Sequence, residues 1–196
     1  MGSRDTILAR IKANKPDAIS LPQIDATLFD DGYNLTKEFT KKVEVVGGNV
    51  LEAQTNQDII KQITTMIPNT TVNFSTLPDT LDFNTIDLET IKKPQELEDL
   101  DILILESDLA VAENGAVWVT DENLPMRALP FITKHLVFVL SKENIVPYMH
   151  QAYNKLSESS TDFGVFISGP SKTADIEQSL VIGAHGALSL TIFLKD

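Results

Sequence analysis

Apolar residues recur every three to four positions through much of the first half of the chain, which is the period of an amphipathic helix. Short runs of apolar and β-branched residues separate these stretches and are typical of strands. In chain order, the pattern predicts a short amphipathic helix over 4–13, a helix over 35–46 that ends at Gly47-Gly48, a strand over 49–53, a helix capped by Thr55 or Asn56 that ends before Pro68, and a strand over 71–74. This alternation indicates an α/β protein.

The second half of the chain contains continuous apolar runs, which are expected for strands that are buried on both faces. We predict that the runs over 102–105, 136–140 and 163–167 are the central strands of a sheet. A helix over 145–156 is predicted between the last two, and a final strand over 188–194. The stretch over 75–100 predicts a surface excursion with one edge strand at 85–88.

Composition narrows the class of protein. The 196 residues include 16 Lys plus Arg and 28 Asp plus Glu, and the net charge of −12 argues against nucleic acid as a partner. The chain has no cysteine, which excludes thiolate zinc sites, iron–sulfur ligation by cysteine and cysteine nucleophiles. No apolar stretch approaches the ~18 residues of a membrane span, and no signal peptide is recognisable. We therefore expect one cytoplasmic α/β domain over 1–196, with an N-terminal helix and variable part over about 1–100 and a motif-bearing part over about 101–196.

The segment over 108–119 consists of two β-like runs joined by Asn114-Gly115, which predicts a hairpin with a type I′ turn. Glu113 stands at the entrance of this turn, after a run of small apolar residues. Partial burial there would raise the pKa of its carboxyl or make it a strong nucleophile. The alternative is an ordinary exposed glutamate beside a turn.

The segment over 166–177 predicts a strand, a tight loop and a helix. Such a loop directs free backbone N–H groups into the crevice at the strand ends, where α/β proteins bind ligands. The segment is neither a Walker loop nor a Gly-x-Gly-x-x-Gly loop. In the alternative interpretation, Ser171 or Thr173 only caps the helix, and acidic residues such as Asp175 complement its dipole. The candidate ligand-binding residues of this loop are Gly169, Ser171, Lys172 and Thr173, and Asp175 is a candidate catalytic residue.

Two further residues have chemistry suited to a site. His185 stands in Gly183-Ala184-His185-Gly186, where neutral imidazole would act as an acid or base near pH 7 or make only a backbone hydrogen bond. Arg127 stands in an apolar, proline-bounded segment and would clamp a carboxylate or phosphate, or form a structural ion pair. His135 and His150 have no neighbour at metal-ligand spacing, so no metal site is expected.

Four segments resemble the LUD domain, the lactate-utilisation protein C family: 108–115, 127–130, 168–177 and 183–186. Their order and spacing match over roughly the last hundred residues, and Ser-Gly-Pro-Ser-x-Thr-Ala-Asp-Ile-Glu is a specific run. The family commonly has Glu-Thr-Gly where this chain has Glu113-Asn114-Gly115, Arg at Lys172 and Pro at Ala187. The resemblance implies a three-layer α/β/α sandwich similar to the glucosamine-phosphate deaminase, ribose-phosphate isomerase and CoA-transferase group.

The resemblance leads to two hypotheses of function. In the first, the chain is a non-redox accessory subunit of a bacterial system that oxidises L-lactate to pyruvate, and the iron–sulfur clusters reside only on partner proteins. In the second, it is an enzyme or binder of an anionic small molecule. Glu113-Asn114-Gly115 also resembles the segment that carries the catalytic glutamate of class I CoA-transferases, in which case Glu113 is the nucleophile and Arg127 and Lys172 hold anionic groups. A single clustered site requires that Glu113, Arg127, Asp175 and His185 open onto one crevice.

Overall fold

The computed structural model describes residues 2–17, 19–20, 22–23, 25, 28, 32–157, 161–174, 180–183 and 185–196. It divides into two units, residues 1–31 and residues 32–196. The first unit contains α1 (Ser3–Ala13), which confirms the predicted N-terminal helix. Its apolar residues Ile7, Leu8 and Ile11 are exposed.

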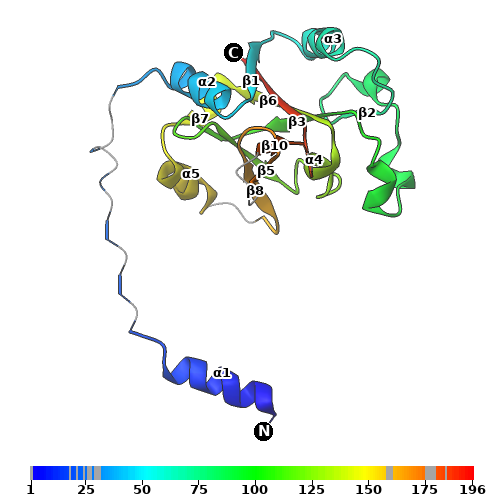
Figure 1. The fold of residues 1–196 in the computed structure, drawn as a ribbon. Coiled ribbons are helices and arrows are strands. Elements are labelled where there is room, and N and C mark those ends of the chain that lie inside the picture. The colour runs from blue at the N-terminus through cyan, green and yellow to red at the C-terminus, as the bar shows by residue number, and fades with distance from the viewer. Residues whose placement is uncertain are drawn as a thin grey trace. The chain divides into compact units, whose positions relative to one another are not determined.

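The second unit contains the remaining described elements (Figure 1). The helices are α2 (Leu35–Val45), α3 (Asn56–Met66), α4 (Leu129–Ile132) and α5 (Met149–Leu156), with the 3-10 helices η2 (Leu81–Phe83), η3 (Leu88–Thr90), η4 (Pro94–Leu97) and η5 (Lys142–Asn144). The strands are β1 (Asn49–Glu52), β2 (Asn73–Ser75), β3 (Ile102–Ser107), β4 (Ala110–Val111), β5 (Ala116–Thr120), β6 (His135–Ser141), β7 (Ile145–Val146), β8 (Gly164–Ile167), β9 (Lys172–Ala174), β10 (Leu180–Ile182) and β11 (Ser189–Lys195). No helix within the described ranges is long and apolar enough to cross a membrane.

The central sheet has five parallel strands in the order β1-β11-β6-β3-β2. Strands β3, β6 and β11 are almost entirely buried because apolar residues occupy both of their faces. The predicted strands at 102–105, 136–140 and 188–194 are therefore confirmed. The expected α/β class with a central parallel sheet flanked by helices is confirmed as well.

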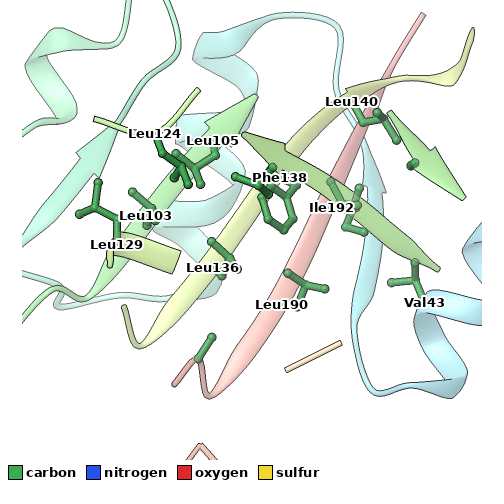
Figure 2. Packing of buried hydrophobic residues seen from close by; sticks show 14 of the residues in the cluster. Val43, Leu103, Leu105, Leu124, Leu129, Leu136, Phe138, Leu140, Leu190 and Ile192 are labelled. Atoms are coloured by element: carbon green, nitrogen blue, oxygen red, sulfur yellow. The ribbon is translucent and has the colours of Figure 1, made fainter. Parts of the chain in front are cut away.

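Alternate residues of the central strands enter two separate cores. One face packs against Ile59 and Ile63 of α3. The other face packs against Phe39 and Val43 of α2 and against residues of a second sheet. Figure 2 shows this second core, in which Leu103 and Leu105 of β3, Leu136, Phe138 and Leu140 of β6, and Leu190 and Ile192 of β11 lie together with Val43.

The second sheet has the order β7-β4-β5-β8. β5 alternates in the way expected of a strand between two layers, because Val117 and Val119 enter the large core while Trp118 joins a smaller one. The smaller core contains Ala152 of α5, so α5 covers the outer face of the second sheet.

Local signals explain why α2 begins and ends where it does. The side chain of Asn34 accepts a hydrogen bond from the Lys37 N–H at 3.0 Å and caps the first turn. At the other end, the N–H of Gly48 donates to the Val43 carbonyl at 2.8 Å, and Gly47 adopts a positive φ of 87°. This is a Schellman termination, as Gly47-Gly48 predicts.

Among the elements described so far, three sequence predictions are wrong. The run over 163–167 forms β8, an edge strand of the second sheet, and β11 takes the central position. The predicted helix over 145–156 begins only at Met149, because Ile145 and Val146 pair with β4 as a strand. Residues 85–88 form no strand, and the stretch over 75–100 contains 3-10 helices instead. In the first two cases, pairing with a distant strand decided between structures that the apolar pattern alone does not separate.

One carboxylate joins the amino ends of three strands of the central sheet. Asp101 precedes β3 and accepts hydrogen bonds from the N–H groups of Thr71 and Val72, before β2, at 2.8 and 3.1 Å. Its other oxygen accepts one from the Lys134 ammonium, before β6, at 2.8 Å. Burial opposes ionisation of Asp101, but Lys134 and the two N–H groups outweigh it and hold the pKa of this carboxyl well below its usual range.

We expect Asp101→Asn to lower the free energy of unfolding by about 2 kcal/mol at pH 7, because an ionised acceptor shared by several donors is lost. Since the folded-state pKa is depressed, this contribution is present above the unfolded pKa of about 3.9 and is lost as the pH falls below it. The difference in the free energy of unfolding between wild type and variant should therefore become smaller below about pH 4. Urea unfolding at several pH values measures it, with the exposed Asp99→Asn as control. A gap that does not depend on pH would contradict this assignment.

Candidate functional site

The predicted hairpin is present, but its turn differs from the prediction. β4 and β5 pair antiparallel, with Val111 opposite Ala116, so the loop spans residues 112–115. Only Gly115 in this loop has a positive φ, of 66°, whereas a type I′ turn needs two such residues. The N–H of Gly115 donates to the Val111 carbonyl at 3.0 Å. The turn is therefore longer than Asn-Gly alone predicts, and Glu113 lies within it.

The segment after β7 holds Glu113 through both backbone and side chain. Its N–H donates to the Pro147 carbonyl at 3.0 Å, which continues the parallel pairing of β4 and β7. Its Oε2 accepts a hydrogen bond from the N–H of Met149, the first residue of α5, at 2.9 Å. A carboxylate at a helix N-terminus is stabilised by the free N–H groups and the helix dipole. The side chain is exposed, so the partial burial considered for Glu113 is not found.

A small cavity of about 140 Å³ lies beside Glu113. Its walls combine apolar, aromatic and charged groups from α2 and the residues before it, from the hairpin loop and from the segment before α5. The lining residues are Tyr33, Leu35, Glu38, Lys42, Ala112, Glu113, Pro147 and Tyr148. The sequence predicted only Glu113 among them. The Glu38–Lys42 spacing is visible in the sequence as an i,i+4 pair, but it is equally typical of any exposed helix face.

The close approach of α2 to the hairpin brings Lys42 beside Glu113. A Cβ atom on Gly115 would lie 2.8 Å from the Val43 nitrogen and 3.1 Å from the Lys42 carbonyl carbon. Only glycine allows the two backbones to come this close. Gly115, which the sequence predicts as a turn residue, therefore also allows the hairpin to pack against α2.

The loop after β8 also packs against the C-terminal end of α2. The Ser168 hydroxyl donates to the Asn114 carbonyl at 2.8 Å, and the Lys172 ammonium donates to the Val46 carbonyl at the end of α2. A Cβ atom on Gly169, whose φ is 73°, would lie 2.6 Å from the same carbonyl oxygen. Gly169 and Lys172, predicted to bind a ligand, thus contact the C-terminus of α2.

The predicted loop and helix over 168–177 are only partly found. Residues 172–174 form β9, which pairs antiparallel with β10, so the helix expected to begin near Ser171 or Thr173 is wrong for the described residues. Thr173 pairs with Val181. Asp175 lies outside the described residues.

Ser171 and His185 contact each other, although through the backbone of His185. The Ser171 hydroxyl donates to the His185 carbonyl at 3.1 Å, and the Ser171 N–H donates to the Ala187 carbonyl at 2.8 Å. Ser171 therefore holds the turn that carries His185. The imidazole itself belongs to an exposed residue.

Arg127 pairs with an acidic residue at the end of β5 that is remote from Glu113. Its Nη2 donates to Asp121 Oδ2 at 3.2 Å, and its guanidinium lies 5.1 Å from the centre of the Phe163 ring. Asp121 follows β5, whereas Glu113 precedes it, and the five residues of β5 span about 16 Å at about 3.3 Å per residue. The expectation that Arg127 and Glu113 open onto one crevice is therefore wrong, and Arg127 forms the ion pair considered as its alternative.

The other histidines have structural contacts. His135 Nδ1 lies 2.8 Å from the Ser189 hydroxyl, and burial lowers the pKa of its imidazole. The His150 ring stacks on Tyr148 with ring centres 5.7 Å apart. Within the ranges that the structure describes, no group of three His, Asp or Glu residues is placed to hold a metal ion.

The model of the LUD domain family matches residues 79–194. This span contains the hairpin, Arg127, the loop after β8 and His185. Among curated proteins, the chain is 30% identical over 130 residues to "Lactate utilization protein C" of Oceanobacillus iheyensis, covering 63% of this chain and 56% of that protein. It is 36% identical over 97 residues to the protein of the same name from Geobacillus kaustophilus, covering 46% and 40% of the two chains. The chain thus spans about half the length of these relatives.

A solved structure has a similar fold. The crystal structure of a DUF162 family protein from Deinococcus radiodurans aligns with a TM-score of 0.64 over 83% of this chain and 96% of that chain. The two sequences are only 16% identical, so this likeness concerns the fold alone.

The contact of Gly169 with α2 predicts a large effect of one methyl group. Gly169→Ala adds a Cβ atom 2.6 Å from the Val46 carbonyl oxygen, while Gly47→Ala adds one no closer than 3.7 Å to Pro170. Both positions have positive φ, so the backbone strain of alanine, about 1 kcal/mol, is shared. We expect Gly169→Ala to destabilise by about 1–3 kcal/mol more than Gly47→Ala in urea unfolding. Equal losses would show that the close approach does not matter.

Proposed function

Because the chain belongs to the LUD domain family, we propose that it acts in lactate utilisation as the non-redox subunit of a bacterial system that oxidises L-lactate to pyruvate. The observation that supports this proposal most directly is its similarity to two proteins named "Lactate utilization protein C". The matched family span, residues 79–194, includes Glu113 and the loop after β8 that contacts α2, whereas the α2 side of the cavity precedes it.

The side-chain chemistry supports a division of labour between this chain and its partners. Oxidation of a 2-hydroxy acid to a 2-keto acid removes two electrons and two protons, and a redox group must accept the electrons. Iron–sulfur clusters are held mainly by cysteine thiolates, and these 196 residues contain no cysteine. In this proposal the clusters are on partner proteins, and this chain binds a reactant or holds the partners together.

This proposal predicts the composition of the native complex. When the full chain is purified anaerobically through an affinity tag from its own cells grown on L-lactate, we expect iron–sulfur proteins to co-purify in fixed ratio. Their clusters should be visible by absorbance and by iron analysis. A tagged cytosolic protein of similar charge, carried through the same steps, controls for non-specific capture. Repeated purification without any iron–sulfur partner would count against the proposal.

A second candidate function follows from the position of Glu113. Its exposed carboxylate lines a cavity, and a backbone N–H holds one of its oxygens at 2.9 Å. In a CoA-transferase-like reaction, this carboxylate would attack the thioester carbonyl of an acyl-CoA, forming an acyl-glutamyl anhydride while the C–S bond breaks and CoA leaves as the thiolate. The cavity of about 140 Å³ has room for the acyl group, so the coenzyme itself would lie on the surface.

Mass spectrometry tests this second function. After incubation with acetyl-CoA, the candidate reaction predicts about one equivalent of free CoA and one acetyl group attached at Glu113. Glu113→Gln should abolish both products because the amide is not a nucleophile. Glu38→Gln, a change in another carboxylate of the same cavity, should leave both products in place. No CoA release from wild type, or equal release from Glu113→Gln, would exclude this function.

A further inference from the structure

We propose that Lys42 and Glu113 together form a binding site for a short 2-hydroxy monocarboxylate, in which Lys42 binds the carboxylate and Glu113 accepts a hydrogen bond from the 2-hydroxyl. This inference rests on the proposed role in lactate utilisation, and it names the ligand class and the cation of the site. The sequence suggested Arg127 and Lys172 for the cation. In the structure, Arg127 forms an ion pair with Asp121, and Lys172 donates a hydrogen bond to the Val46 carbonyl.

The volume of the cavity limits the size of the ligand. The space of about 140 Å³ is small, and a small organic acid of about six non-hydrogen atoms suits it. Drug-sized ligands occupy pockets of about 300 Å³ or more, so most of a nucleotide or a sugar phosphate would lie outside this cavity.

Lys42 can supply the positive charge. Its ammonium lies 3.7 Å from the nearest Glu38 oxygen, and its side chain is 39% exposed, so this ion pair is loose. An exposed i,i+4 pair of this kind contributes only about 0.3–0.5 kcal/mol and is readily exchanged for a better partner. An ammonium group has three N–H donors, which allows it to bind a ligand carboxylate while it remains near Glu38.

The carboxylate of Glu113 is suited to accept a hydrogen bond from the 2-hydroxyl group of the ligand. An ionised carboxylate is only an acceptor, with about four lone-pair positions on its two oxygens, and the Met149 N–H uses one of them. The α5 N-terminus fixes this carboxylate, so it needs little reorganisation to accept a further hydrogen bond. A 2-keto acid has no hydroxyl proton to donate and would place its own lone pairs against Glu113. The site should therefore prefer the hydroxy acid to the keto acid.

The remaining walls fit a short apolar substituent. Tyr33, Leu35, Ala112 and Pro147 line the same cavity as the two charged groups. A methyl group on the 2-carbon would pack against them. A second carboxylate on the ligand would instead meet the two acidic residues of the cavity, Glu38 and Glu113, which favours a monocarboxylate.

Isothermal titration calorimetry on the full chain tests the site, with L-lactate, pyruvate and propionate as probes. We expect wild type to bind L-lactate about tenfold more tightly than pyruvate or propionate, the effect of one charge-assisted hydrogen bond. Lys42→Gln should weaken L-lactate binding about tenfold. The matched control is Lys41→Gln, a change at the neighbouring exposed position of α2, which should leave binding unchanged. Glu113→Gln should remove most of the preference for L-lactate, because an amide can also donate to a keto oxygen.

The inference is overturned if wild type binds none of the three acids, if L-lactate and pyruvate bind equally, or if Lys42→Gln behaves like Lys41→Gln. Thermal unfolding of each variant shows whether a loss of binding reflects a loss of folding. The anaerobic purification separates this inference from the proposed function. Co-purification of iron–sulfur partners without L-lactate binding would contradict the proposed site but support the proposed function. L-lactate binding with the expected preference, but without co-purifying partners, would support the site and contradict the function.

Discussion

Two glycines allow other parts of the chain to pass close to the C-terminal turn of α2. Gly115 in the hairpin and Gly169 in the loop after β8 both have positive φ, and a Cβ atom on either would overlap the backbone at Val43 or at Val46. Phe39 and Val43 anchor the helix in the large core. The position of Lys42 relative to Glu113 follows from this arrangement, because both line a cavity that α2 closes from one side. Residues 114–115 and 168–172 therefore hold the helix that forms one wall of the cavity, and Lys172 donates to the Val46 carbonyl at its end.

The Asp101 network and the candidate binding cavity are located at different places in the second unit. The Asp101 network joins the amino ends of β2, β3 and β6, where N–H groups converge on one carboxylate. The cavity lies at the second sheet instead. β4, β7 and β8 run parallel to one another, so their carboxyl ends share one edge, and residues 112–113, 147–149 and 168–169 follow them there. Ligands of α/β proteins commonly bind beyond the carboxyl ends of strands. Here that rule applies to the smaller sheet, whose edge presents Glu113 and the first N–H of α5 together.

The predictability of each element depends on whether its cause is local. The Thr55 cap of α3, the Gly47-Gly48 termination of α2 and the long apolar runs of β3, β6 and β11 depend on residues close in sequence, so the sequence predicts them. The errors occur where a distant partner decides. Ile145 belongs to a strand because it pairs with Ala110, and residues 172–174 form a strand because they pair with 180–182. The run over 163–167 has the composition of a buried strand, yet it lies at the edge of the second sheet.

The same distinction explains why the sequence identified one half of the candidate site. Glu113 is conspicuous because it adjoins an Asn-Gly turn, whereas nothing near Lys42 distinguishes it from the other lysines of α2. Arg127 is conspicuous for its isolation, but its partners Asp121 and Phe163 account for it. In a chain with a net charge of −12, an anionic ligand is repelled over most of the surface. Binding of such a ligand then depends on one local cation whose own ion pair is weak. The loose contact between Lys42 and Glu38 makes Lys42 better suited to this task than Lys134, whose ammonium is bound to Asp101 at 2.8 Å.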